Sequence, residues 1–234
     1  MQDETRKTCY SVPFLENIPF ILHGFGSRYF NEQLPPKNIQ SKNLKYVFLD
    51  QIHSDIIHAV SELSDKNLKG DALLTDYPGI LLGVRTADCL PVLLVDKKKK
   101  VVAAVHCGWR GTKEKLVEKA VKEMAALYKC ERSSLLAALG PCIEQDCYEV
   151  GEEVRESFNA AGIRDDFFLS SAAKKGRYYF DLKRANRYQL LKAGVKPVNI
   201  FSVDLCTYCE ESLFSYRRDG FKTGRMVNFI GLLY

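Results

Sequence analysis

Three residues of this chain could hold a metal ion, and each stands at the edge of an apolar run. They are His53, Cys89 and His106, and the chain has only four histidines in all. Imidazole nitrogen and thiolate sulfur are ligands that zinc takes in proteins. A zinc ion held by three side chains keeps a fourth position for water or substrate, as in catalytic sites. The residue types therefore suggest a catalytic zinc site if the fold brings the three side chains together.

The proximity of two of these residues follows from the local pattern. Apolar runs at 92–96 and 101–106 flank the lysine run 97–100, which is typical of a solvated turn between two antiparallel strands. Because a hairpin returns its end close to its start, Cys89 and His106 can meet. The spacing does not bring His53 to the same place. Taken singly, the histidines could be ordinary satisfied residues and the cysteine a small buried hydrophobe.

Polar residues accompany these ligands. Asp88 lies between two apolar runs, where an unpartnered buried carboxylate is costly, so a functional role explains it better than packing does. Gly108 and Gly111 enclose Trp109 and Arg110 in a tight turn that leads into a helix. A helix N-terminus attracts anions, and the guanidinium fork of Arg110 suits a phosphate. The alternative is an ordinary strand–turn–helix junction with the tryptophan in the core.

Hydrophobic periodicity predicts an α+β fold with a mixed sheet, in a single domain spanning residues 1–234. Pro35 and Pro36 mark residues 31–42 as a surface loop. Asp181 is predicted to cap a helix that ends at Gly194. The expected strands are 47–53, 80–86, 92–96, 101–106, 135–139, 199–204 and 225–229, and the expected helices are 113–128, 150–160 and 182–193.

The composition excludes several classes of protein. The net charge of +5 is too small for a dedicated nucleic-acid binder. The longest apolar region, 80–95, is interrupted by Arg85, Asp88 and Pro91, so no membrane span is expected. Without an export signal the protein is expected in the reducing cytoplasm, where its eight cysteines serve metal binding, catalysis or burial. No Gly-rich phosphate loop or dinucleotide fingerprint occurs, so neither ATP nor NAD is expected.

A series of motifs covering about residues 12 to 230 resembles the YfiH family, also called the laccase-domain or polyphenol oxidase family. Several motifs in series are far more specific than any one of them. In chain order they are His23-Gly-Phe-Gly-Ser-Arg28, Gln51-x-His53-Ser54, Thr86-Ala-Asp-Cys89-x-Pro91, His106-x-Gly-Trp-Arg-Gly111, Gly140-Pro-x-Ile143, Cys147-Tyr-Glu-Val150, Phe180-Asp-Leu182, Cys206-Thr207, Phe214-x-x-Arg217-Arg218 and Gly224-Arg225.

The resemblance implies a four-layer α/β/β/α sandwich with mixed sheets and a zinc site at His53, Cys89 and His106. It implies phosphorolysis of adenosine, inosine and methylthioadenosine, together with deamination of adenosine; an older label is copper-dependent polyphenol oxidation. The partners would be a purine nucleoside and phosphate, and the protein a monomer or homodimer. Family members typically have Ser-Thr-Arg where this chain has Gly26-Ser27-Arg28. Many have Ala or Ser at Cys107, which is therefore not counted as a ligand.

Phosphorolysis and deamination require different groups in one site. Deamination needs an activated water, which zinc supplies, and a group that carries protons to the leaving ammonia, for which Asp88 is the candidate. Phosphorolysis needs an anion site beside the ribose, for which Arg28 and Arg110 are the candidates. The expected catalytic residues are Asp88, Cys89 and His106.

Other functions stay open at this point. A metal-free cysteine hydrolase would use Cys89 as nucleophile and His106 as base, but this mechanism gives His53 no role. A multicopper oxidase needs more histidines than the four present. A metal-stabilised interaction protein would show no turnover of small molecules. The Cys-x-x-Cys pair Cys206 and Cys209 is typical of a redox motif or of half a zinc site.

Overall fold

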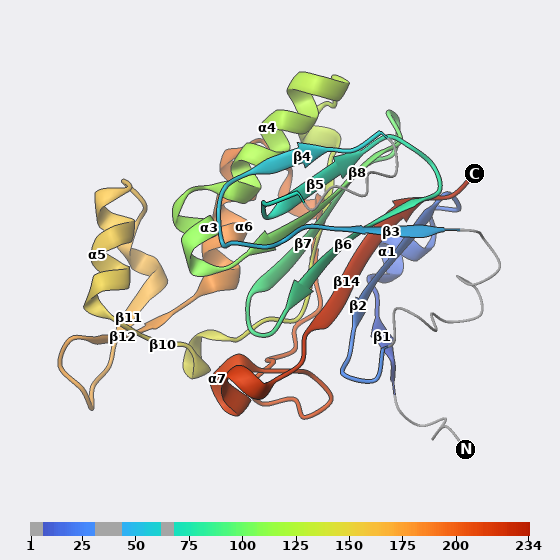
Figure 1. Cartoon of the computed structure of the whole chain (residues 1–234). Coiled ribbons are helices and arrows are strands. Elements are labelled where there is room, and N and C mark those ends of the chain that lie inside the picture. The colour runs from blue at the N-terminus through green and yellow to red at the C-terminus, as the bar shows by residue number, and fades with distance from the viewer. Residues whose placement is uncertain (1–6, 31–43, 62–67) are drawn as a thin grey trace, which may run out of the picture.

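Two stacked β-sheets and a set of helices form the computed structural model, which describes residues 7–30, 44–61 and 68–234 (Figure 1). The five-stranded sheet has the order β1 (Cys9–Tyr10), β2 (Ile21–Gly26), β14 (Met226–Leu232), β6 (Ile80–Thr86) and β3 (Lys45–Phe48). The six-stranded sheet has the order β13 (Ile200–Ser202), β9 (Leu136–Leu139), β7 (Leu90–Asp96), β8 (Val101–Cys107), β5 (Ala72–Thr75) and β4 (Ile57–Ala59). Each sheet contains both parallel and antiparallel pairs.

Helices and a small third sheet complete the fold. The three-stranded sheet pairs β10 (Glu149–Gly151), β12 (Arg177–Phe180) and β11 (Phe168–Ser170). The α-helices are α1 (Pro13–Glu16), α3 (Trp109–Lys113), α4 (Leu116–Tyr128), α5 (Glu152–Ala160), α6 (Leu182–Lys192) and α7 (Tyr216–Asp219). Short 3-10 turns are η1 (Arg132–Ser134), η2 (Gln145–Cys147), η3 (Asp165–Phe167), η4 (Pro197–Asn199) and η5 (Gly220–Lys222). In the described part of the chain, every helix is too short or too polar to cross a membrane.

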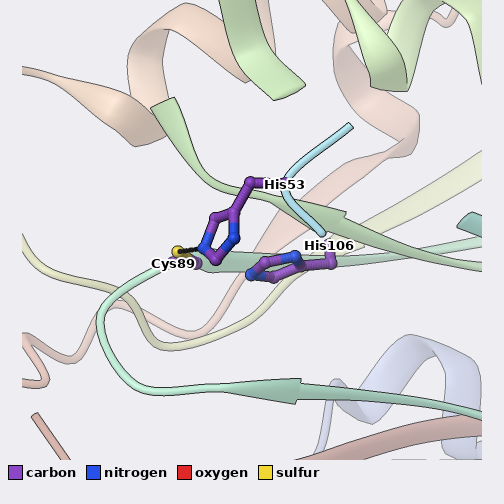
Figure 2. A group of neighbouring side chains, drawn as sticks. All are labelled: His53, Cys89 and His106. Carbon is purple, nitrogen blue, oxygen red and sulfur yellow. Dashed lines mark hydrogen bonds between the residues drawn. The ribbon is translucent and has the colours of Figure 1, made fainter. Parts of the chain in front are cut away.

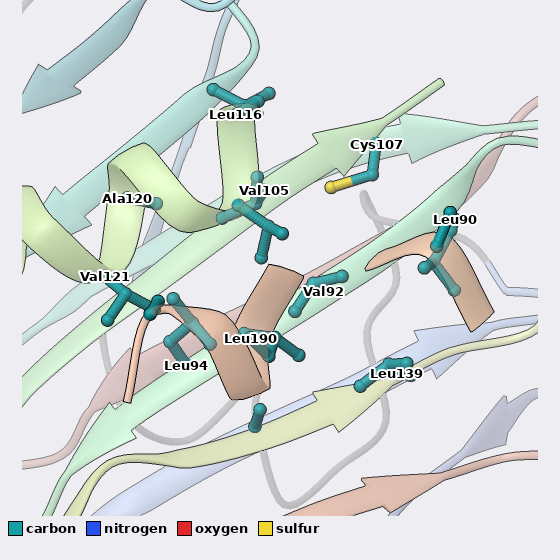
Figure 3. Packing of buried hydrophobic residues seen from close by; sticks show 14 of the residues in the cluster. Leu90, Val92, Leu94, Val105, Cys107, Leu116, Ala120, Val121, Leu139 and Leu190 are labelled. Atoms are coloured by element: carbon teal, nitrogen blue, oxygen red, sulfur yellow. The ribbon is translucent and has the colours of Figure 1, made fainter. Parts of the chain in front are cut away.

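The six-stranded sheet is buried on both faces. Val92 and Leu94 of β7 pack against the helices α4 and α6, as Figure 3 shows, and contribute to one core cluster. Leu93 and Val95 point the other way, into the cluster shared with the five-stranded sheet. Since neighbouring residues of a strand face opposite sides, burial of both faces makes these strands continuous apolar runs in the sequence. The predicted α+β fold with mixed sheets is confirmed.

The predicted hairpin is also confirmed. Strands β7 and β8 pair in antiparallel register, from Leu90 opposite Cys107 to Asp96 opposite Val101. The lysines 97–100 form the exposed turn, and Asp96 Oδ1 accepts hydrogen bonds from the backbone N–H groups of the second and third of them, at 2.8 and 2.9 Å. This hairpin fixes the relative positions of its two ends.

Several predicted elements have different bounds in the structure. The helix expected at 113–128 begins at Leu116 as α4, because the backbone of Lys115 is left-handed (φ 61°) and cannot continue an α-helix; Lys113 instead ends the separate helix α3. The helix expected from residue 150 begins at Glu152, because Val150 pairs with β12. The strand expected at 47–53 is β3, which ends at Phe48. The helix α6 begins after its predicted cap Asp181, which accepts a hydrogen bond from the Arg184 N–H. The predicted loop 31–42 lies outside the described residues.

Candidate metal centre

The structure brings His53, Cys89 and His106 to one point. Their ligand atoms all lie within 4.8 Å of one another, and Cys89 Sγ is 4.0 Å from His53 Nε2 (Figure 2). The two imidazole rings meet at 69°, with centroids 5.0 Å apart. The residues come from three separate places: the loop after β3, the turn between β6 and β7, and the end of β8. The other two histidines lie elsewhere, with His23 accepting from the Val12 N–H and His58 bonded to the Lys69 carbonyl.

The hairpin register explains why Cys89 and His106 meet. Pro91 of β7 stands opposite His106, so Cys89 lies just beyond the paired residues at the same end of the hairpin. Along β8, side chains alternate between the two faces, and His106 takes the face opposite to that of Cys107. Cys107 is fully buried and belongs to the core cluster that residues of α4 and α6 share, drawn in Figure 3. This agrees with its exclusion from the ligand set.

A buried carboxylate, Asp71, organises two of the three ligands. Its Oδ1 accepts hydrogen bonds from His106 Nδ1–H at 2.8 Å and from the His53 backbone N–H at 3.1 Å. Its Oδ2 accepts from the N–H and the hydroxyl of Ser54. Because Nδ1 is bonded to Asp71, Nε2 is the ring nitrogen of His106 that can face Cys89 or a metal ion. Carboxylates that fix metal-binding histidines in this way set both the tautomer and the ring orientation.

Asp71 is a functional residue that the sequence reasoning missed. The available signal resembled the one used for Asp88: a single acidic residue directly before an apolar run, here the strand β5. The residue is fully buried, and burial opposes its ionisation. The hydrogen bonds from His106 and Ser54 outweigh that penalty and lower the pKa of Asp71 to about 2. Asp71 is therefore negatively charged at neutral pH and lies behind His106.

The cluster favours ionised forms in the absence of a cation. Burial raises the pKa of the Cys89 thiol, but His106 and His53 beside it more than offset this and leave the pKa below its usual value. Burial likewise disfavours the charged form of His106, and the neighbouring Cys89 and Asp71 reverse this and raise its pKa. The arrangement thus supplies a thiolate at neutral pH, the form in which cysteine binds metals or attacks carbon.

The backbone is strained at two residues of this site. His53 and Asp88 have positive φ values of 58° and 88°, in a region that residues other than glycine rarely adopt. Hydrogen bonds hold both residues in place: Asp71 holds His53, while Thr207 Oγ1–H and the Arg217 N–H donate to the two oxygens of Asp88 at 2.7 and 2.6 Å. The side chain of Asp88 is thus anchored to the C-terminal segment that carries Thr207 and Arg217.

Gly108 is needed for the ligands to come this close. A Cβ atom at this position would lie 3.0 Å from both Cys89 Sγ and His53 Cδ2. Any side chain would therefore push against two of the three ligands. The backbone approaches these two side chains at Gly108, where the chain leaves β8, whereas residues 109–111, predicted as a tight turn before a helix, already belong to the helix α3.

The three ligands lie in the wall of a cavity of about 670 Å³. Four arginines, two aspartates and three large aromatic residues are among the residues that line it, so basic residues outnumber acidic ones. Arg110, the predicted phosphate ligand, is among them. The arginines and large aromatic residues of the lining are Arg85, Arg110, Arg217, Arg225, Trp109, Tyr148 and Tyr216.

Arg28 does not belong to this lining. Its Nη2–H donates to the Leu213 carbonyl at 3.2 Å, and its guanidinium lies near the ring of Phe214 and 3.9 Å from Asp219. These contacts bind it to the C-terminal segment. Arg217 and Arg225, which sequence reasoning placed in motifs but not in the site, reach the cavity from that same segment.

Comparison with known proteins gives consistent relatives. Residues 31–233 match a family model described as "Multi-copper polyphenol oxidoreductase laccase". The chain is similar to a purine nucleoside phosphorylase of Clostridium acetobutylicum, with 42% identity over 86% of each chain. It is also 42% identical to a prokaryotic protein named adenosine deaminase RL5, over 66% of this chain and 59% of that protein.

Solved structures share the fold. The chain resembles the YfiH protein of Bacillus licheniformis with a TM-score of 0.81 and 32% identity, covering 91% of this chain and 92% of the other. YlmD of Geobacillus stearothermophilus gives a TM-score of 0.80 and 27% identity, covering 93% of each chain. A relative in Shigella flexneri named YfiH is 38% identical over 81% of this chain and 74% of its own length. The ordered motifs, the fold and these similarities together establish that the chain belongs to the YfiH family.

Proposed function

We propose that this protein is a zinc-dependent purine nucleoside phosphorylase that also deaminates adenosine. The observation that carries the proposal is the convergence of two imidazoles and one thiolate in the wall of a cavity rich in arginine and aromatic residues. The cavity volume of about 670 Å³ lies in the range of small-molecule sites. The names of the relatives in Clostridium acetobutylicum and Shigella flexneri support the same activity.

The donor set fits zinc. A tetrahedral ion with usual zinc–sulfur and zinc–nitrogen distances separates its ligand atoms by about 3.6 Å, close to the 4.0 Å between Cys89 Sγ and His53 Nε2. His106 offers Nε2 because Asp71 occupies Nδ1. Zinc held by His53, Cys89 and His106 would supply Lewis-acid polarisation and activation of water. A multicopper centre would need more imidazoles than the two that converge here.

Arginines of the cavity suit the phosphate. Among the described residues, Arg217 and Arg225 each use Nη1 to donate to backbone carbonyls, at 2.8 to 3.1 Å. The remaining N–H groups of each fork stay available for an anion. Arg110 stacks on Trp109 at 4.4 Å, which orients its guanidinium within the lining. We assign phosphate binding to Arg110 and Arg217, with Arg225 beside them, and withdraw Arg28 from this role.

The reaction needs a nucleoside held between these groups. In phosphorolysis a phosphate oxygen forms a bond to ribose C1′, the C1′–N9 electron pair leaves with the purine, and the purine takes up a proton. Tyr148 and Tyr216 present rings for the base, and the Tyr148 ring packs against the Arg217 guanidinium at 5.4 Å. Asp88 is proposed to carry the proton to the leaving ammonia in the deamination of adenosine.

Product analysis tests the proposal. Purified protein given inosine and phosphate should form hypoxanthine and ribose 1-phosphate, and adenosine should yield adenine with some inosine. Cys89→Ala should abolish these products, whereas Cys9→Ala, which removes a thiol outside the cavity, should leave them unchanged. Equal product formation by the Cys89→Ala variant and the wild type would refute the assigned centre.

One observation favours a second candidate, a metal-free cysteine hydrolase. Cys89, His106 and Asp71 occur in the order of nucleophile, base and orienting carboxylate, and the Asp71–His106 bond of 2.8 Å resembles that of a catalytic triad. Metal analysis separates the candidates. The hydrolase retains activity after chelation and does not depend on His53, whereas the phosphorylase loses activity under chelation and in His53→Ala. His58→Ala serves as the matched control, since His58 bonds to a backbone carbonyl outside the cluster.

A further inference from the structure

A second cluster of soft ligands lies outside the cavity. Cys147 ends η2, and Cys206 and Cys209 stand between β13 and α7. The three Sγ atoms lie within 4.8 Å of one another, and those of Cys147 and Cys209 are 3.5 Å apart. A tetrahedral zinc ion with the usual zinc–sulfur distance of about 2.3 Å separates its sulfurs by about 3.8 Å. The three thiols therefore have the spacing of a metal-binding set.

Backbone hydrogen bonds hold the two segments in register. Cys142 and Cys206 form an isolated parallel bridge, and the Thr207 N–H donates to the Cys142 carbonyl at 3.0 Å. The Glu144 N–H donates to Cys206 Sγ at 3.5 Å, and the Glu210 N–H donates to the Cys206 carbonyl at 2.9 Å. The convergence of the thiols therefore rests on main-chain structure as well as on side-chain rotamers, so the site is formed in advance.

We propose that Cys147, Cys206 and Cys209 bind a second metal ion, a thiophilic divalent cation of the zinc type. Three thiols rather than two, with two of them in a Cys-x-x-Cys chelate, favour a cation over a simple disulfide pair. Cys209 is exposed and the other two are half-buried, so the ion can enter and solvent can supply its fourth ligand. Binding displaces the thiol protons to solvent, and no atom changes its oxidation state.

The second site would position the first. Thr207 lies between the two cysteines of the chelate, and its hydroxyl donates to Asp88 Oδ1 at 2.7 Å. Arg218 Nη1–H donates to the Thr207 and Tyr208 carbonyls at 3.0 and 3.1 Å, and so closes the same loop. A cation at the three thiols would fix this loop to η2. Through the Thr207 hydroxyl it would then hold the carboxylate of Asp88 in its present position. The binding itself does not depend on the activity proposed above.

Metal content tests the inference without reference to turnover. Protein stripped with a chelator under reducing conditions and reloaded with Zn²⁺ should hold two ions per chain by elemental analysis. Cys209→Ser and Cys147→Ser should each hold one, retained at the histidine cluster, and His53→Ala should also hold one. Cys9→Ser is the matched control and should hold two. Circular dichroism confirms that each variant is folded.

Cobalt substitution identifies the ligands. Co²⁺ bound to three thiolates gives much stronger sulfur-to-metal charge transfer than Co²⁺ bound to one, so Cys209→Ser should lose most of that absorption. His53→Ala should keep most of it. Unchanged metal content in both the Cys147 and Cys209 variants would overturn the proposal. The proposal would also be overturned by two results together. Mass spectrometry would find a Cys147–Cys209 disulfide in the wild-type protein, and the same protein, once reduced, would bind only one ion per chain.

Discussion

The two clusters, each with three soft ligands within 4.8 Å, differ mainly in what surrounds them. His53, Cys89 and His106 face a cavity with four arginines, and a buried carboxylate lies behind them. Cys147, Cys206 and Cys209 come from two chain segments that backbone hydrogen bonds join, and the Glu144 N–H donates to the sulfur of Cys206. The number of possible ligands is the same, so we attribute the proposed difference between a reactive site and a supporting one to the neighbouring groups.

Electrostatics separates the clusters in the same way. In the first, the histidines overcome the effect of burial and lower the pKa of Cys89. In the second, burial also opposes ionisation of Cys206, and the N–H groups of Glu144, Cys209 and Tyr208 outweigh it and lower its pKa. Burial and the neighbouring thiols raise the pKa of Cys147 to about 12. The second cluster therefore gains full ionisation only with a cation present, whereas the first supplies a thiolate by itself.

Loss of a ligand at the first cluster should have the largest effect. The Cys89→Ala and His106→Ala variants should no longer bind metal at this site. Their rate of phosphorolysis should fall by more than about 100-fold, because loss of a residue that merely orients a ligand already costs about 10- to 100-fold. Ribose 1-phosphate formation and elemental analysis are the measurements. Cys209→Ser is the comparison, since it should retain the ion at the first cluster. If Cys209→Ser loses as much activity as Cys89→Ala, the two clusters do not differ in their importance for the reaction.

Asp71→Asn should have the next largest effect. The amide keeps the size of the side chain but removes the charge behind His106, so metal affinity or turnover should fall about 10- to 100-fold. Competition with a zinc chelator measures the affinity. Asp165→Asn, at an exposed ion pair with Arg155, is the control and should behave as wild type. If Asp71→Asn binds zinc with wild-type affinity, the Asp71 carboxylate does not support the metal site.

Acid stability should also distinguish Asp71. Its folded pKa of about 2 lies below the ordinary 3.8, so its charge stabilises the fold above about pH 4. That contribution, on the order of 2 kcal/mol, is lost as pH falls toward 2. In urea unfolding of the metal-free protein, Asp71→Asn should lose less stability than wild type between pH 5 and 2.5, a range set around these pKa values. Parallel curves for the two proteins would contradict the assignment.

The smallest effect concerns the connection between the clusters. Thr207→Val removes the hydroxyl that donates to Asp88, and a buried hydrogen bond of this kind contributes about 1 kcal/mol. Turnover should fall roughly five-fold, while both ions stay bound. Thr207→Ser keeps the hydroxyl and should restore the rate. If the serine variant is as slow as the valine variant, the hydrogen bond is not the cause.

The sequence predicted those parts of the site that depend on local pattern. The lysine turn between two apolar runs was enough to bring Cys89 close to His106, because a hairpin has one simple geometry. The position of His53 needed the family resemblance, since the loop that carries it is held by Asp71 and by Gln51, which bonds to the Arg85 backbone. No local pattern reports such distant partners.

The missed residues have the same explanation. Asp71 precedes the strand β5, which was not predicted, so its neighbours were unknown. Cys147 and Cys209 are 62 residues apart, and only the folded chain brings them together. Arg28 was assigned to phosphate by its motif, yet its contacts with Leu213 and Asp219 keep it out of the cavity lining. Long-range packing, rather than residue type, decided these outcomes.

We propose that an ion held by His53, Cys89 and His106 serves nucleoside cleavage. The most direct measurement follows ribose 1-phosphate formation from inosine and phosphate by chelator-stripped Cys209→Ser protein as Zn²⁺ is added back. The account predicts no product without metal and a linear rise in rate that levels off at one ion per chain. Full activity in the stripped protein, or no activity after one ion has bound, would contradict it.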